Sequence, residues 1–279
     1  MIANHVIATQ VGEALFEDLG FAIDYSANLV DSATLSHAVI KAKQDLVLCG
    51  IKWVNQTFMQ IDPNTTLNWH YQEGDKVKSG SILVDIHGCA PSILSAERTA
   101  LNFLQTLSAT ATTVRAFVDR VSSTSTKIMD TRKTIPGLRL AQKYAVTVGG
   151  GHNQRMGLYD GVLIKENHIS ACGGVDLALQ FAFDKTPKHI PIQIEVETYD
   201  QLVEAISHNA KLILLDNMSV DQIKDCVKYA KDKDVELEAS GNINLDNVLE
   251  YAKTGVHRIS LGCLTKNISA IDLSLIILD

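Results

Sequence analysis

The stretch from Ile190 to Ser240, IPIQIEVETYDQLVEAISHNAKLILLDNMSVDQIKDCVKYAKDKDVELEAS, decides the fold class of this chain. It holds three short apolar runs, Ile190–Val196, Leu212–Leu215 and Val235–Glu238, which are separated by segments of helical periodicity. Strand-length runs that alternate with helices in this way are typical of βαβ units, whose strands form a parallel sheet. The stretch therefore predicts an α/β fold.

The same alternation extends to both sides of this stretch. Further apolar runs occur at Lys127–Met129, Gly161–Ile164 and Arg258–Leu261, which makes six runs in the C-terminal half. Six parallel strands could form an open sheet or an incomplete barrel. No GxGxxG motif follows any of the runs, so the sequence does not support a Rossmann dinucleotide site.

Polar or small residues stand where most of these runs end. In α/β barrels the C-terminal ends of the strands carry the catalytic residues, whereas a buried strand has no structural need for a charge there. A single such residue would mean little, because Asp and Ser also cap helices. A series of them predicts a site at this edge, built from Asp130–Lys133, Lys165–Asn167, Glu195–Glu197, Asp216–Asn217, Ser240–Gly241 and Gly262.

Composition limits the possible functions of the chain. Its 279 residues suffice for two ordinary domains or one barrel, and a net charge of -7 with 6% aromatic residues argues against a nucleic-acid partner. No apolar run is long enough to span a membrane, and the N-terminal stretch lacks the features of a signal peptide. Five cysteines without a CxxC motif fit reduced thiols. We therefore expect a cytoplasmic protein.

The first ~95 residues follow a different pattern. Helical periodicity covers 9–25 and 31–44, and a long helix is expected from Ala96 to Val121 with Ser95 as its N-cap. The strands expected in this part are Asp45–Trp53, Leu67–Tyr71 and Ile82–Ile86.

A cationic cluster lies within this acidic chain. Basic side chains on helix faces usually only contact water, but here they surround Gly149–Gly151 and several stand at strand ends. This placement indicates a site for a small polyanion that carries several carboxylates or phosphates. The cations are Arg132, Lys133, Arg139, Lys143, Arg155 and Lys165.

Two further features of the strand ends suggest a metal and a phosphate. Glu195 and Asp216 could share one Mg²⁺, held directly or through water, although a salt bridge to Lys133 or Lys165 would also explain them. Glycine-containing strand ends in barrels often hold a phosphate on backbone N–H groups, because no Cβ blocks its approach. Two segments have this character, Ser240-Gly241-Asn242 and Ser260-Leu261-Gly262.

Taken together, these motifs resemble a known family. In chain order they are ERTALN (Glu97–Asn102), DTRKT-PG-R-(x)₃-KYAV (Asp130–Val146), GGG-(x)₃-R-(x)₂-L-D-(x)₄-K-NH (Gly149–His168), EVE (Glu195–Glu197), LDNM (Leu215–Met218), EASGNI (Glu238–Ile243) and SLG (Ser260–Gly262). The set resembles quinolinate phosphoribosyltransferase, a type II phosphoribosyltransferase family, and covers most of the chain.

The resemblance implies an open, incomplete α/β barrel of residues 107–266 and an N-terminal α/β sandwich-like domain of residues 1–106 completed by 267–279. It implies phosphoribosyl transfer from phosphoribosyl pyrophosphate to quinolinate with decarboxylation, which gives nicotinate mononucleotide, pyrophosphate and CO₂ for NAD biosynthesis. It also implies Mg²⁺ as cofactor and a homodimer in which Arg98 enters the partner's site.

Residue by residue, the resemblance assigns the two carboxylates of quinolinate to Arg132, Lys133, Arg155 and Lys165. It assigns Mg²⁺-bound phosphoribosyl pyrophosphate to Glu195 and Asp216, and the phosphates of that substrate to Ser240, Gly241 and Gly262. The residues expected to act in catalysis are Lys133, Lys165, Glu195 and Asp216, with either lysine able to stabilise or protonate the ylide left by loss of CO₂.

The chain departs from the family pattern in two places. Gln154-Arg155 stands where the family usually has His-Arg, and Lys266 stands where a His is common. Gln154 cannot transfer a proton, so we do not expect it to be catalytic, and His152 is a weak candidate to replace the missing His. His168 fits a structural role as well as a functional one.

Three other functions fit parts of the sequence. A related enzyme that uses nicotinate would need fewer cations, so the density of Arg and Lys favours the diacid. A class I aldolase-like barrel would use Lys165 as a Schiff-base lysine but leaves Glu195 and Asp216 less well explained. A phosphate-sensing barrel would lack a metal pair or a nucleophile site, and neither is missing here.

Overall fold

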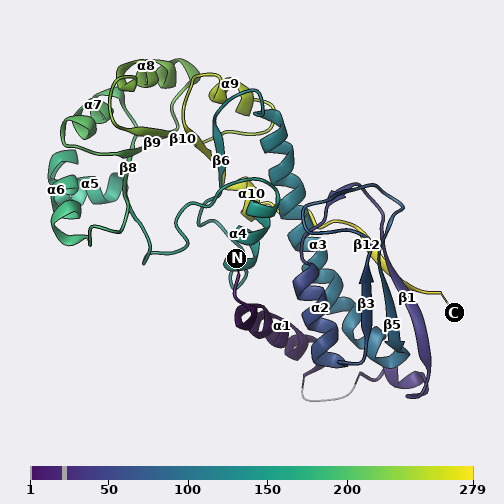
Figure 1. Ribbon diagram of the computed structural model, residues 1–279. Helices are drawn as coiled ribbons and strands as arrows, with labels where there is room; N and C mark the ends of the chain where they lie inside the picture. Colours follow the sequence, from purple (N-terminus) through teal and green to yellow (C-terminus); the bar gives the residue numbers. More distant parts are fainter. Residues whose placement is uncertain (1, 21–23, 279) are drawn as a thin grey trace. The chain divides into compact units, whose positions relative to one another are not determined.

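The computed structural model describes residues 2–20 and 24–278 and divides into two compact units (Figure 1). Unit 1 consists of Met1–Arg115, Ile135–Gly150 and Asn267–Asp279, and unit 2 of Ala116–Thr134 and Gly151–Lys266. The predicted division placed all of 107–266 in one domain. The contacts instead group Ile135–Gly150 with the N-terminal residues, so the chain leaves unit 2 and returns to it between the first two strands of that unit.

Unit 2 is built on a six-stranded parallel sheet of order β6-β11-β10-β9-β8-β7. All six apolar runs of the sequence become strands, which confirms the predicted α/β class. β6 and β7 are the two edges of the sheet, so the described strands form an open barrel and not a closed one. The strands are β6 (Lys127–Met129), β7 (Val162–Ile164), β8 (Ile192–Val196), β9 (Leu212–Asp216), β10 (Glu236–Ser240) and β11 (Arg258–Ser260).

The helices of unit 2 follow the strands, and Figure 1 shows α6 to α9 on the outer side of the arc that β8 to β10 line. Polar caps set where two of them start: Thr198 accepts from the backbone N–H of Gln201, and Ser219 forms a capping box with Gln222. Asp216 therefore does not cap the helix that follows it. The helices are α5 (Glu166–Cys172), α6 (Val175–Lys185), α7 (Tyr199–Ser207), α8 (Val220–Ala230), α9 (Val248–Ala252) and α10 (Cys263–Lys266).

Unit 1 contains an antiparallel sheet of order β12-β1-β5-β3. Its buried face packs with Phe58 and Ile93 in one apolar core, while Trp53 and Leu107 belong to a second core beside the first helix. The strands are β1 (Leu35–Ala42), β2 (Leu46–Val47), β3 (Thr66–Trp69), β4 (Lys76–Val77), β5 (Ile82–Cys89) and β12 (Leu273–Ile277). The helices are α1 (Asn4–Leu19), the 3-10 turn η1 (Ala27–Leu29), α2 (Ile51–Ile61), α3 (Ala90–Arg120) and α4 (Arg139–Val148). The last residues of α3 belong to unit 2.

Four local predictions for the N-terminal part need correction or qualification. The helix expected over 31–44 is wrong, because this segment is strand β1, paired with β5 and with β12. The strand expected over Asp45–Trp53 is mostly wrong, since it shrinks to β2 and is followed by α2. The long helix begins at Ala90, before Ser95. The helix expected over 9–25 ends at Leu19, and residues 21–23 lie outside the described residues.

Helix α3 is the longest of the described helices, with 31 residues. In the parts of the chain that the structure covers, no helix is both long enough and apolar enough to cross a membrane.

Candidate active site

A cavity of about 210 Å³ opens at the C-terminal ends of the parallel strands of unit 2. This is the edge at which the sequence predicted a site, and the loops after the strands build its wall. Seven of the predicted site residues line it together. The lining consists of Thr131, Arg132, Lys133, Gln154, Arg155, Leu163, Lys165, Gln193, Glu195, Leu214, Asp216, Glu238, Ser240 and Ser260.

Two guanidinium groups form one side of the cavity. The guanidinium of Arg155 donates to the backbone carbonyl of Gly161 at 2.9 Å, which fixes its orientation. Burial and the nearby charge of Arg132 both lower the pKa of Arg155. Two arginines that repel each other across a partly buried site create a strong local preference for an anion, and their planar donors suit carboxylates.

The Lys133 loop is held from both directions. Its backbone N–H donates to Thr131 Oγ1 at 3.1 Å, and Thr265 Oγ1 donates to its carbonyl oxygen at 2.7 Å. Gly262 leaves room for this lysine, because a Cβ at Gly262 would lie 2.9 Å from Lys133 Cδ. The loop thus aims a cation into the cavity beside the end of β11.

Lys165 connects the cationic side of the cavity to its acidic side. Its Nζ lies 3.0 Å from Oε2 and 3.3 Å from Oε1 of Glu195. His168 Nδ1 accepts from the backbone N–H of Lys165 at 3.0 Å and so closes the capping box at the start of α5. His168 therefore has a structural role, since it fixes the backbone from which Lys165 reaches into the cavity.

The pKa of each acidic residue of the predicted metal pair is raised. Burial raises the pKa of Glu195 against the opposing effect of Lys165, and the charge of Asp216 raises it further. Burial also raises the pKa of Asp216, against the effects of Lys165 and Lys133. Glu195 is buried and Asp216 is half-buried, and a bound cation would stabilise the ionised form of both carboxylates.

The loops after β9 and β10 adopt conformations that need their particular residues. Asn217 has φ +55, its amide donates to Asp216 Oδ2 at 2.7 Å, and its backbone N–H donates to the carbonyl of Ser240 at 2.9 Å. Gly241 has φ +95, and a Cβ there would lie 2.2 Å from Asn217 Oδ1. Glycine is thus required for the two loops to approach each other.

Below the charged rim, three polar side chains form the inner part of the cavity, which we call the floor: Gln154, Gln193 and Glu238. Glu238 accepts from the side-chain amides of Gln154 and Gln193, the second at 3.1 Å. Sequence reasoning did not assign these residues to the site. Strand alternation could have found two of them, because Gln193 and Glu238 stand two residues before Glu195 and Ser240 and so face the same side.

Not all the predicted residues meet in this cavity. Gly241 and Gly262 adjoin it but do not line it. Arg139 and Lys143 belong to α4 in unit 1, where Lys143 is fully buried, so neither residue is part of the lining of this cavity. His152 is exposed and makes backbone contacts with the strand segment around Met129, without lining the cavity.

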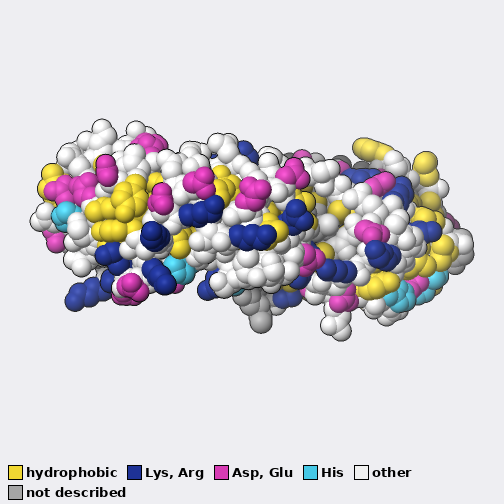
Figure 2. Space-filling view, turned by 90° about the horizontal axis from the view of Figure 1, so that it is seen from above, with side chains coloured by type: hydrophobic (Ala, Val, Ile, Leu, Met, Phe, Trp, Pro, Cys, Tyr) yellow, Lys and Arg dark blue, Asp and Glu magenta, His cyan; other side chains and the backbone are white. Residues whose placement is uncertain are grey.

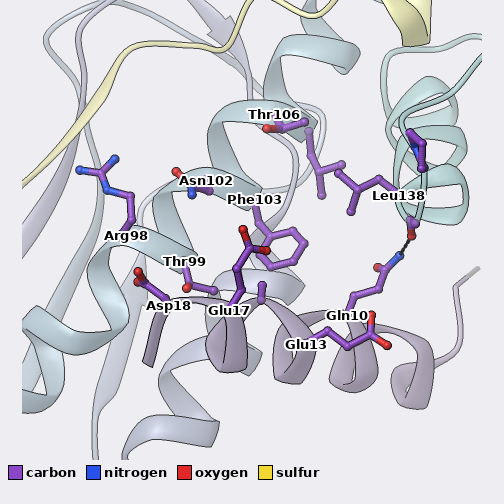
Figure 3. Close-up of a pocket in the computed structure, with 14 residues that line it drawn as sticks. Gln10, Glu13, Glu17, Asp18, Arg98, Thr99, Asn102, Phe103, Thr106 and Leu138 are labelled. Carbon is purple, nitrogen blue, oxygen red and sulfur yellow. Dashed lines mark hydrogen bonds between the residues drawn. The ribbon is translucent and has the colours of Figure 1, made fainter. Parts of the chain in front are cut away.

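Arg98 lies in unit 1, on helix α3, and lines a separate cavity of about 500 Å³ between α3 and α1. Figure 3 shows Arg98 at one end of that cavity, with Asn102 beside it and with Gln10 and Leu138 at the other end. Acidic side chains of α1, Glu13, Glu17 and Asp18, line the same cavity.

The face of the molecule drawn in Figure 2 carries both signs of charge. Figure 2 shows Lys and Arg side chains interspersed with Asp and Glu over the visible face, without one continuous basic area. This distribution fits a local site for a small anion better than a surface that binds a nucleic-acid backbone.

Comparison with known proteins places both parts of the chain in one family. Residues 24–108 match the N-terminal domain of quinolinate phosphoribosyl transferase, and residues 110–276 match its C-terminal domain. The two matches follow each other along the chain in the order expected for a whole enzyme of this family.

Individual relatives agree with the domain matches. A probable nicotinate-nucleotide pyrophosphorylase (carboxylating) of Bacillus subtilis is 38% identical over 273 residues, which cover 98% of this chain and 94% of that protein. The solved nicotinate-nucleotide pyrophosphorylase of Francisella tularensis is 42% identical with a TM-score of 0.95, over 99% and 98% of the two chains. The corresponding enzyme of Ehrlichia chaffeensis is 40% identical with a TM-score of 0.91, over 96% and 97%. This chain belongs to the quinolinate phosphoribosyltransferase family.

Proposed function

We propose that the cavity of unit 2 is the active site for the reaction of this family. The chain transfers the phosphoribosyl group of phosphoribosyl pyrophosphate to quinolinate and releases pyrophosphate and CO₂, with nicotinate mononucleotide as the product. The observation that carries the placement is that one cavity is lined by four cations and by two carboxylates, with Gly241 and Gly262 adjoining it.

On the cationic side, quinolinate binds through its two adjacent carboxylates. Arg132 and Arg155 supply planar donors that can each take both oxygens of a carboxylate, while Lys133 and Lys165 add single charges. Nicotinate has one carboxylate and would leave some of these cations without an anion. The cavity therefore favours the diacid.

On the acidic side, the residues fit a Mg²⁺ ion that arrives with the diphosphate. Mg²⁺ is usually held in proteins by one or two carboxylates together with substrate phosphates and water. Glu195 and Asp216 supply two such carboxylates, and among residues 2–20 and 24–278 no group of three or more His, Cys, Asp or Glu is arranged to hold a metal by itself. When bound, Mg²⁺ would neutralise charge on the departing pyrophosphate.

The phosphates of the same substrate are assigned to the loops after β10 and β11. Ser240 offers a hydroxyl, and Gly241 and Gly262 expose backbone at positions where a side chain would collide with Asn217 or Lys133. Backbone N–H groups at strand ends of this kind are a common way to hold phosphate.

The reaction then proceeds in two steps. The lone pair of the quinolinate ring nitrogen forms a bond to ribose C1, while the bond from C1 to pyrophosphate breaks and pyrophosphate keeps the electron pair. The ring is now a pyridinium, so the bond from C2 to its carboxylate can break and release CO₂. The electron pair stays on C2 until a proton reaches it. We assign the stabilisation of that carbanion, or the supply of the proton, to Lys133 or Lys165, which both line the cavity.

The proposal includes a homodimer in which Arg98 of one protomer acts at the cavity of the other. Two observations support it. Arg98 belongs to unit 1, where it lies at the end of a cavity lined by α1 and α3. The predicted cations Arg132, Lys133, Arg155 and Lys165 instead line the cavity of unit 2.

The proposal also places the enzyme in the cytoplasm, in keeping with five cysteines that are all free thiols.

The test is a product assay with quinolinate and phosphoribosyl pyrophosphate, with and without Mg²⁺, in which CO₂ and mononucleotide are followed together. We expect equal amounts of both products, formed only when Mg²⁺ is present. Nicotinate serves as the control acid and should give little mononucleotide. Turnover of nicotinate equal to that of quinolinate, or turnover without a divalent cation, would contradict the proposal.

A further inference from the structure

The carboxylate of Glu238 at the floor of the cavity has an unusual set of partners. The residue is 1% exposed. Its Oε2 accepts from Gln154 Nε2 and from Gln193 Nε2, while its Oε1 has no hydrogen-bond partner among the described residues. Glu238 therefore has its charge held by two amides, and no described cation forms an ion pair with it.

The two amides also fix each other. Gln154 Nε2 lies 3.3 Å from Gln193 Oε1, and the backbone N–H of Gln154 donates to the buried Asp130 at 2.8 Å. Each amide thus has a defined orientation, Gln193 on β8 and Gln154 in the loop before β7. An amide donor holds a carboxylate in place, but unlike Lys or Arg it does not cancel the negative charge.

A buried carboxylate without a cation costs free energy, and barrel interiors at this depth are usually filled by branched apolar side chains. The position of Glu238 is set by the sheet, because its backbone pairs with Leu214 on one side and with Arg258 on the other, and the side chain of Arg258 forms its ion pair with Glu236. Three polar residues at the floor thus form an arrangement that stability alone would not favour. Because no described cation forms an ion pair with Glu238, a positive charge that develops inside the cavity can offset part of this cost.

We propose that Glu238 is a fixed negative charge that stabilises the positive charge developing on ribose C1 and on the ring nitrogen during transfer, and that Gln154 and Gln193 are the residues that position it. The inference rests on the proposed function of the cavity. The same inference gives Gln154 a role. A neutral amide at position 154 donates a hydrogen bond to Glu238 without neutralising its negative charge.

This role makes a specific demand on binding. Quinolinate enters as a dianion, so Glu238 repels it before the reaction and attracts the cationic centre only as the transition state forms. An interaction that is favourable in the transition state and unfavourable in the ground state raises kcat without improving substrate affinity. Removal of the charge should therefore affect rate and affinity in opposite directions.

The experiment compares Glu238→Gln with wild type in kcat and in the Kd for quinolinate measured by calorimetry. We expect kcat to fall about 10²-fold or more, which is the usual loss when one preorganised electrostatic group is removed. We expect the Kd for quinolinate to fall about threefold, because a repulsive charge has gone. Asp234→Asn removes an exposed charge just before the same strand, at a residue paired with Lys211, and should change neither value.

Glu238→Asp separates charge from packing. The substitution keeps the charge but shortens the side chain, whereas Glu238→Gln keeps the shape and removes the charge. If the charge matters, Glu238→Asp keeps more kcat than Glu238→Gln. If Glu238 only fills space, the order is reversed, and that result, or a Glu238→Gln variant whose kcat and quinolinate affinity both match wild type, would overturn the inference.

Failure of this inference is distinguishable from failure of the proposed function. Wild-type protein that does not turn over quinolinate contradicts the proposed function before any variant is made. Wild-type protein that turns over quinolinate, together with variants in the wrong order, contradicts only the role of Glu238. Thermal denaturation of each variant checks that all three proteins are folded.

Discussion

The ammonium group of Lys165 lies 3.0 Å from Oε2 and 3.3 Å from Oε1 of Glu195, so one ion pair links the two sides of the cavity. Lys165 is assigned to the diacid and Glu195 to the Mg²⁺-bound substrate. Quinolinate therefore competes with Glu195 for Lys165, and the Mg²⁺-bound substrate competes with Lys165 for Glu195. Binding of one substrate would release the partner residue for the other.

This link predicts the effect of Glu195→Gln. Loss of the carboxylate removes a proposed metal ligand, so we expect kcat/KM for phosphoribosyl pyrophosphate to fall about 10²- to 10³-fold. The same change loosens the contact with Lys165, and quinolinate should bind at least as tightly as it does to wild type. Steady-state kinetics and calorimetry measure the two effects. A parallel loss of quinolinate affinity would show that Glu195 does not divide the site in this way.

Asp216 should make the protein less stable at neutral pH. Its pKa is raised, chiefly by burial, so the folded protein holds this proton more tightly than the unfolded chain does. The free energy of unfolding therefore falls as pH rises from the ordinary pKa of 3.8 through the raised pKa of the folded protein. Above the raised pKa the protein stays less stable by the same amount. Asp216→Asn should have a higher melting temperature than wild type at pH 7, and the difference should shrink towards acid pH, while activity is lost.

Asp221 is the matched control for that measurement. It is an exposed carboxylate at the start of α8, and its hydrogen bond with Lys224 lowers its pKa. The effect on stability has the opposite sign: ionised Asp221 stabilises the folded protein above pH 3.8, and this stabilisation is lost as pH falls through the lowered pKa. Asp221→Asn should therefore be no more stable than wild type at pH 7. Equal shifts of the melting temperature for the two variants would contradict the raised pKa of Asp216.

We predict that activity needs glycine at position 241 because the loop after β10 approaches Asn217 closely there, and not only because of the backbone angle of Gly241. It has φ +95, and an added Cβ would lie 2.2 Å from Asn217 Oδ1 and 2.8 Å from the backbone N of Asn217. Gly241→Ala should displace the Asp216–Asn217 loop and raise KM for phosphoribosyl pyrophosphate about tenfold or more.

Gly80 offers the comparison. It has φ +90, but an added Cβ would meet nothing within 4 Å. Both alanine variants should lose about 1–2 kcal/mol of stability from the left-handed backbone. Only Gly241→Ala should lose activity. Similar kinetics in the two variants would mean that the two loops do not need this contact for substrate binding.

The proposed dimer predicts that two inactive proteins restore activity when mixed. Arg98→Ala damages the contribution of unit 1, and Asp216→Asn damages the cavity of unit 2. If Arg98 acts on the partner, a mixed dimer contains one intact site, and random exchange of subunits should restore about one quarter of wild-type activity. Activity that stays at the level of the separate variants would place Arg98 and Asp216 in the same protomer's site, or outside a shared site.

The strands of unit 2 were predictable because the signal for them is local. Each is a short apolar run that the sheet buries on both faces, and most end at or just before a polar residue that lines the cavity. The residues that line the rim could be found for the same reason. Gln193 was missed because it stands within a run, and Glu238 because it was counted as the last residue of one. At such positions the sequence alone does not separate a cavity residue from a core residue.

The errors in unit 1 have non-local causes. Residues 31–44 contain good helix formers, yet β1 is held by pairing with β5 and with β12, and β12 lies more than two hundred residues later in the chain. Helix α2 starts where the carboxylate of Glu73 accepts from the backbone N–H groups of Gly50 and Ile51. Neither partner is visible from the local pattern of the segment.

The most direct test of the central claim is a crystal structure of the enzyme with quinolinate bound. The account predicts that the two carboxylates of quinolinate contact Arg132, Arg155 and the lysines of the unit 2 cavity, with the ring nitrogen turned towards the side of Glu195 and Asp216. Quinolinate bound elsewhere, for example in the α1–α3 cavity of unit 1 alone, or bound with its carboxylates away from these cations, would contradict it.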